Sequence, residues 1–237
     1  MTQVAFVLLW VLVGHGMAAA AWFGLINTPE SNILMLAVSA SLVVVGALVL
    51  LWTSASAARA LVVSRPPWRG LSVVTAMLPG ALLGVLVVGV LCGLAGWFEG
   101  WWTAHAGQVD AAAIAAGDVT DTAWLHEAVR WTVALVQWVL VPTWLATSLA
   151  WAAAYGTRHV ASMKWLLVGL HPRVVVVALV AVVVLVWLPW QGVYWRPASL
   201  PTSMEPAFIA LKLGTLYVAA NLAWVLVLAE TVRLVRR

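Results

Sequence analysis

Six long apolar stretches, separated by short polar turns, occupy most of the chain. They cover approximately residues 4–26, 33–61, 71–103, 123–155, 174–190 and 206–232. Each approaches or exceeds the roughly 20 residues that a helix needs to cross the hydrocarbon core of a bilayer. Membrane β-strands alternate apolar and polar residues over about 10 positions, and this pattern does not recur here. The sequence therefore predicts a single all-α domain of six transmembrane helices over residues 1–237.

Composition excludes a water-soluble fold. Of the 237 residues, 65% are hydrophobic and only 8% are charged. A soluble domain has about 45–50% apolar and about 25% charged residues. Because so few charged side chains cannot cover so much apolar surface, the lipid bilayer is the predicted environment.

The basic residues predict an orientation. If the amino terminus is cytoplasmic, nine of the twelve Lys and Arg residues fall on the inner side. These are Arg59, Arg65, Arg69, Arg158, Lys164, Arg173, Arg233, Arg236 and Arg237. Cytoplasmic loops carry such an excess, so both termini are expected inside, in an inner or plasma membrane. The net charge of +4 is then explained by topology and lipid headgroups, and no nucleic-acid partner is required.

The third and fourth stretches are longer than a bilayer requires. About 20 residues counted outward from Leu71, and back from Tyr155, end near Val90 and Val136. Unless both helices tilt strongly, residues 91–135 extend from the membrane as an extracytoplasmic helical hairpin. Its many tryptophans suit a membrane or protein interface, so this hairpin is the first candidate for a docking or ligand site.

The hairpin also contains residues that could handle a metal ion or a proton. His126 precedes Glu127 and Arg130 on one helix, and His105 could approach from the other arm. The alternative is that Glu127 and Arg130 form an i, i+3 ion pair and the histidines are solvated. No second histidine follows at zinc-binding spacing on the same helix, which favours the alternative.

His15 lies near the middle of the first span, where an ionisable side chain indicates a function by default. Gly14 and Gly16 leave space on both sides of the imidazole, so a flat macrocycle such as haem or a pigment could reach its nitrogen. Alternatively, the glycines let a neighbouring helix pack closely, and a neutral His15 hydrogen-bonds across to it. The candidate partners for that bond are Gln137, Thr143 and Asn221.

Three polar residues near the last span could bind an anionic headgroup or substrate. Lys212 falls at the predicted outer boundary, Glu205 lies seven residues earlier on the same helical face, and Arg196 is in the preceding loop. Simple anchoring at the interface is the alternative, because a lysine side chain can extend to water there.

Seventeen tryptophans are the compositional anomaly. In the fourth span they occur at Trp124, Trp131, Trp138, Trp144 and Trp151, with spacings of seven, seven, six and seven residues. Seven residues are nearly two helical turns, so the rings should form a stripe. Such a stripe, with Trp131 and Trp138 at its centre, could line a groove for a quinone or pigment. It could equally be a packing seam or a contact with another subunit.

The connection over residues 156–172 mixes basic and apolar residues and is predicted to lie in the cytoplasmic headgroups. The chain has no Walker loop, dinucleotide fingerprint, nucleophile elbow or zincin helix. We therefore expect a non-catalytic membrane subunit that docks other membrane proteins through the Trp-rich helices and the hairpin. A small transporter with a site near Arg196, Glu205 and Lys212 is the first alternative. A redox or lipid-modifying protein using His15, or His105 with His126, is the second.

Overall fold

The computed structural model describes residues 2–28, 32–69, 71–115, 123–195 and 202–237, and every regular element in these ranges is helical. Six segments are long and apolar enough to cross a membrane. They are Gln3–Ile26, Ile33–Val63, Ser72–Ala112, Trp124–Tyr155, Pro172–Tyr194 and Thr202–Val235. The predicted class, an all-α chain with six helices long and apolar enough to span a membrane, is thus confirmed for the described residues.

The first three spans are single helices, α1 (Thr2–Ile26), α2 (Ile33–Val63) and α3 (Leu71–Ala115). The fourth comprises α4 (Ala123–Leu135), η1 (Val136–Leu140) and α5 (Val141–Tyr155). Two short helices follow, α6 (Thr157–Val160) and α7 (Lys164–Gly169). The fifth span comprises α8 (Pro172–Ala181), η2 (Val182–Trp187) and α9 (Leu188–Tyr194). The last is η3 (Thr202–Met204) with α10 (Glu205–Val235).

The interruptions in the fourth and fifth spans are both π-helical turns next to a proline. Element η1 precedes Pro142, and η2 precedes Pro189. Proline has no backbone N–H, and its ring collides with the carbonyl group four residues earlier. A wider π turn at that carbonyl accommodates the ring without ending the helix. The π turn η1 therefore accommodates Pro142 within the fourth span.

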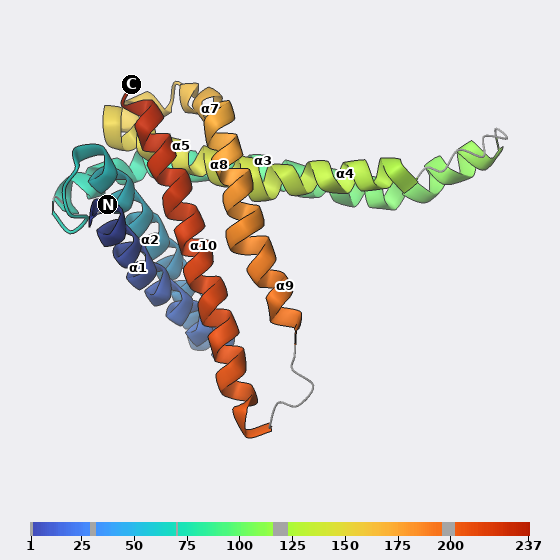
Figure 1. The fold of residues 1–237 in the computed structure, drawn as a ribbon, viewed down its shortest axis with the longest axis horizontal. Coiled ribbons are helices and arrows are strands. Elements are labelled where there is room, and N and C mark those ends of the chain that lie inside the picture. The colour runs from blue at the N-terminus through green and yellow to red at the C-terminus, as the bar shows by residue number, and fades with distance from the viewer. Residues whose placement is uncertain (1, 29–31, 70, 116–122, 196–201) are drawn as a thin grey trace.

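Helices α5, α7, α8 and α10 come together at one end of the molecule, which we call the converging end (Figure 1). Both termini and α7 lie at the converging end, while α1, α2, α9 and α10 run away from it in broadly similar directions. The distal part of α3 and all of α4 run together in a different direction (Figure 1). We call residues 91–115 of α3 together with α4 the arm.

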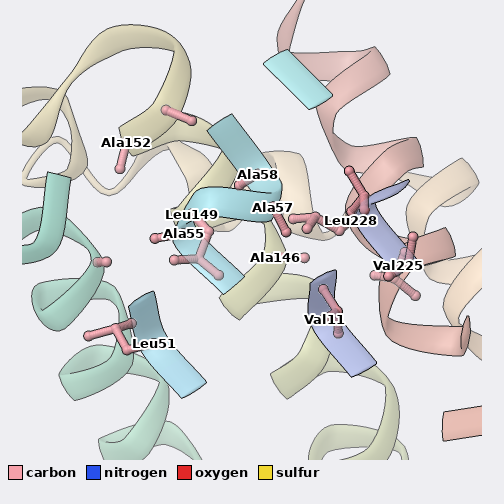
Figure 2. Packing of buried hydrophobic residues seen from close by; sticks show 14 of the residues in the cluster. Val11, Leu51, Ala55, Ala57, Ala58, Ala146, Leu149, Ala152, Val225 and Leu228 are labelled. Carbon is pink, nitrogen blue, oxygen red and sulfur yellow. The ribbon is translucent and has the colours of Figure 1, made fainter. Parts of the chain in front are cut away.

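Small side chains build the core at the converging end. They come mainly from α2 and α5, with further members from α3, α8 and α10, and Val11 of α1 packs beside them (Figure 2). The fully or nearly fully buried members include Ala55, Ala57, Ala58, Ala146, Leu149, Ala152, Val225 and Leu228. Lipid tails are as apolar as these side chains, so membrane helices associate mainly where small residues permit close van der Waals contact.

The connection between α5 and α8 is fixed to this core by tryptophans. The Trp165 side chain is completely buried, and its indole N–H donates to the carbonyl of Val160 over 2.9 Å. The Trp144 indole donates to the carbonyl of Leu166 over 3.1 Å. Between α6 and α7 the chain turns at Met163, whose φ of 55° lies in the left-handed region. Leu167 remains exposed on the outer surface.

Helices α3 and α5 meet where a glycine faces a serine. A Cβ atom added at Gly84 would lie 2.4 Å from Ser148 Oγ and 2.5 Å from Ser148 Cβ. Both distances are below van der Waals contact, so any larger residue must push the helices apart. Gly89, on the same helix, has no atom within 4 Å of the corresponding position.

We expect Gly84→Ala to lower the free energy of unfolding by about 1–3 kcal/mol, the usual cost of overpacking a close contact. Gly89→Ala is the matched control and should leave stability unchanged or raise it, because alanine favours a helix over glycine by up to about 1 kcal/mol. Reversible unfolding in mixed detergent, followed by circular dichroism, measures both. Equal stabilities of the two variants would show that α3 and α5 do not approach at Gly84.

Candidate functional site

A chain of polar side chains links the two helices of the arm. The Trp102 indole N–H, on α3, donates to His126 Nδ1 on α4 over 3.2 Å. On the other side of the same ring, His126 Nε2 lies 3.0 Å from Asp110 Oδ1. The His126 and Asp110 side chains are 28% and 43% exposed, so the group is partly shielded from its surroundings.

These two contacts define the tautomer of His126. An indole nitrogen only donates, so Nδ1 must accept and carries no proton. The neutral ring then has its proton on Nε2, from which it donates to the Asp110 carboxylate. Both nitrogens are occupied in this arrangement, and a metal ion would have to displace Trp102 or Asp110.

His105 occupies a separate position on α3. Its Nδ1 atom lies 2.7 Å from the carbonyl oxygen of Trp101, and its ring stacks on that of Trp101 with centroids 4.7 Å apart. Within the described ranges, no group of three or more His, Cys, Asp or Glu residues is placed to hold a metal ion. Metal binding by His105 and His126 therefore stays a prediction. Arg130 and Glu127 do form an i, i+3 ion pair, at 2.7 Å.

His15 lies among polar side chains of α2 and α10. Its Nε2 atom is 3.4 Å from Ser54 Oγ. Asn221, one of the three partners expected for a structural role, also contacts the imidazole. The buried Asn221 Oδ1 atom nevertheless has no partner with full hydrogen-bond geometry in the described part of the chain.

The two glycines beside His15 face protein atoms. A Cβ atom at Gly14 would lie 2.2 Å from Thr53 Oγ1, and one at Gly16 would lie 3.3 Å from the Tyr217 hydroxyl oxygen. The Tyr217 hydroxyl also donates to the carbonyl of Leu12 over 2.5 Å. In this arrangement the glycines serve close helix packing, and a haem or pigment would have to reach His15 from another direction.

Lys212 caps the end of α9. Its ammonium group donates to the carbonyl of Val193 over 2.8 Å and also to the carbonyl of Trp195, and it lies 4.4 Å from the centre of the Phe208 ring. A positive charge is stabilised at a helix carboxyl terminus, where carbonyl groups lack helical partners. Glu205 begins α10 and is partly buried, whereas Arg196 lies outside the described residues. The anion site predicted for these three residues therefore stays a prediction.

The tryptophan stripe of the fourth span is divided into two parts. Trp124, Trp131 and Trp138 are 68%, 65% and 58% exposed, whereas Trp144 and Trp151 are partly buried against the core. Six residues advance a regular helix by about 600°, roughly a third of a turn short of two full turns. The six-residue step between Trp138 and Trp144, which contains part of η1, therefore moves Trp144 onto a different face.

The contacts that Trp102, Asp110 and Ser54 make were not predicted from the sequence. One usable signal exists: Asp110 and His126 lie eight residues on either side of position 118. In an antiparallel hairpin that turns near that position, residues equally distant from the turn lie opposite each other. Ser54 offers no such signal, because it lies in a run of small residues whose orientation depends on how α1 crosses α2.

No known protein family, no characterised protein and no solved structure matches this chain. The geometry of its own residues therefore carries the functional argument.

We expect His126→Ala to loosen the arm, because it removes the two side-chain contacts that His126 makes with Trp102 and Asp110 of α3. A net loss of about 1 kcal/mol corresponds to roughly fivefold faster backbone hydrogen exchange in α4. His105→Ala is the control, because its ring bonds only within α3 and should leave α4 exchange unchanged. Equal exchange in both variants would contradict the proposed link between the helices.

Proposed function

We propose that the protein is a non-catalytic integral membrane subunit of a larger membrane complex, and that it docks its partners through the arm. The observation that carries this proposal is the row formed by Trp124, Trp131 and Trp138. All three side chains are exposed; Trp124 and Trp131 lie on α4, and Trp138 follows in η1, where the arm joins α5. The arm runs away from the other spans (Figure 1).

The length of the row supports contact with protein rather than anchoring at a lipid headgroup. Fourteen residues separate Trp124 from Trp138, which corresponds to about 21 Å along a helix. Tryptophans that anchor a helix gather at the headgroup level at either end of a span. A row of three exposed tryptophans along one side of the fourth span suits a protein interface, where tryptophan and arginine are enriched. Arg130 lies 5.9 Å from the Trp131 ring and adds a cation to the same surface.

The orientation forms part of the proposal. Arg65 and Arg69 precede α3 in a loop that Gln3 and Arg236 contact near the two termini, and Arg158 follows α5, whose last residue Tyr155 donates to the carbonyl of Val235. The positive-inside rule supports a cytoplasmic location for this end, in an inner or plasma membrane. With 45 residues, α3 is about 68 Å long, more than twice the hydrocarbon thickness. We propose that this excess length, residues 91–115, lies outside the hydrocarbon core together with α4, inclined to α1, α2 and α10 (Figure 1).

The contacts of Lys212 favour this proposal over a transporter. A transporter site near Glu205 and Lys212 needs the ammonium group to be available to an anion. In the structure the ammonium group donates to the Val193 and Trp195 carbonyls and stabilises the end of α9. The contacts of Lys212 thus give this residue a structural role at the end of α9.

We expect the variant carrying Trp131→Ala and Trp138→Ala to lose its partners. Each hot-spot tryptophan at an interface contributes about 2 kcal/mol or more, so partner retention should fall at least about 30-fold. The matched control carries Trp187→Ala and Trp190→Ala, which remove two exposed tryptophans of the fifth span. Quantitative mass spectrometry after mild-detergent purification from the native membrane measures retention.

A solitary wild-type protein in that purification would contradict the proposal. So would a variant lacking Trp131 and Trp138 that retains its partners as well as the control does.

A further inference from the structure

A hollow of about 170 Å³ lies between the start of α1 and the loop after α2. It is lined by Gln3, Phe6, Arg65, Pro66 and Pro67. This position is at the converging end of the molecule, away from the arm and its tryptophans (Figure 1).

The loop that forms one wall is held rigidly. The Gln3 side-chain nitrogen donates to the carbonyls of Ala60 and Arg65, over 2.7 and 3.0 Å. Both hydrogens of that nitrogen are therefore used, and Gln3 positions the loop. At the other side of the hollow, the Phe6 and Trp68 rings meet edge to face with centroids 5.9 Å apart.

The loop also closes on itself. The Arg69 backbone N–H donates to the carbonyl of Pro66 over 3.0 Å, which forms a turn around Pro67 and Trp68. Prolines restrict the backbone, so the wall of the hollow loses little entropy when a ligand binds.

Two guanidinium groups give this loop its charge. Arg65 and Arg69 are exposed, and within the described residues no ion pair involves either of them. Glu230, the acidic residue of α10 nearest the carboxyl terminus, is paired with Arg233 at 3.1 Å. Arg236, the residue after α10, donates to the carbonyl of Val62 and lies 3.4 Å from Ser64 Oγ, which places a further cation at the end of α2.

An apolar track leads away from the hollow along α1. Phe6, Leu9 and Val13 are all about half exposed, and their spacing of three and four residues places them on one face of the helix. Phe6 lines the hollow and begins this face. A charged recess that continues into an apolar track matches a molecule with an anionic head and an acyl chain.

We propose that this hollow is a binding site for an anionic phospholipid. The Arg65 guanidinium, with Arg69 in the same turn, binds the phosphate, since guanidinium groups form paired hydrogen bonds with phosphate oxygens. An acyl chain lies along Phe6, Leu9 and Val13. Basic recesses next to membrane helices are suited to such headgroups. The site shares no residue with the arm, so the test of this proposal does not depend on the proposed subunit role.

The test uses the full chain, purified in mild detergent and examined by native mass spectrometry. Three probes are titrated: phosphatidylglycerol, phosphatidylcholine with the same acyl chains, and water-soluble glycerol phosphate. Arg65→Gln is compared with Arg158→Gln, which removes an exposed arginine at the same end of the molecule but outside the hollow. Circular dichroism checks that both variants keep the helical content of the wild type.

The wild type should bind phosphatidylglycerol more tightly than either of the other probes. Arg65→Gln should weaken that binding about fivefold, as expected for one cation at a membrane surface, and Arg158→Gln should change it less than about twofold. Equal weakening by both variants would show that the lipid is held by diffuse charge attraction and not at a defined site, and would overturn the proposal. If glycerol phosphate binds as tightly as the intact lipid, the site binds a free anion. If phosphatidylcholine binds as tightly as phosphatidylglycerol, the site does not select for charge. Either result also overturns the proposal.

Discussion

Close approach between small side chains is the constraint on which the rest of the structure depends. In a bilayer no hydrophobic force drives helices together, so they meet where van der Waals contact and hydrogen bonds are available. Alanine, serine and threonine are concentrated over residues 53–60 of α2 and 143–153 of α5, and these segments are buried. Residues 33–50 of α2 carry mainly larger aliphatic side chains, most of them exposed. Helix α2 accordingly meets α5 at its carboxyl-terminal half, where Arg59 donates to the carbonyl of Ala153, whereas its first half packs against α1, where Gly46 faces Trp22.

The distal part of α3 and α4 run together, away from the other helices (Figure 1). The contact between these two helices therefore has to come from their own side chains. Trp102, His126 and Asp110 supply it through a neutral imidazole that accepts from one helix at Nδ1 and donates back to it at Nε2. Such a link needs both nitrogens of the ring. The same residue that sequence analysis considered as a metal ligand is therefore fully used in holding α3 against α4.

The fold class and the number of spans could be predicted, because both follow from the length and hydropathy of continuous segments. Local pairs could be predicted as well, as Glu127 with Arg130 shows, since three-residue spacing on a helix brings side chains together. Helix α3 continues to Ala115, beyond the apolar stretch that ends near Thr103, because the alanines after it favour a helix. Contacts between helices, such as His15 with Ser54, depend on how the helices cross, and no local pattern encodes that.

The fourth span shows how one sequence pattern can serve two structural roles. Its tryptophans recur at nearly constant spacing, yet Trp138 is exposed and Trp144 donates to the carbonyl of Leu166 beside the core. The change of role falls at η1, the π turn that accommodates Pro142. The proline and the shortened step together rotate the second half of the stripe inward, so that α5 packs while α4 keeps its tryptophans exposed. Joining a packing helix to an exposed one in a single span lets the core hold the arm in place without covering its aromatic surface.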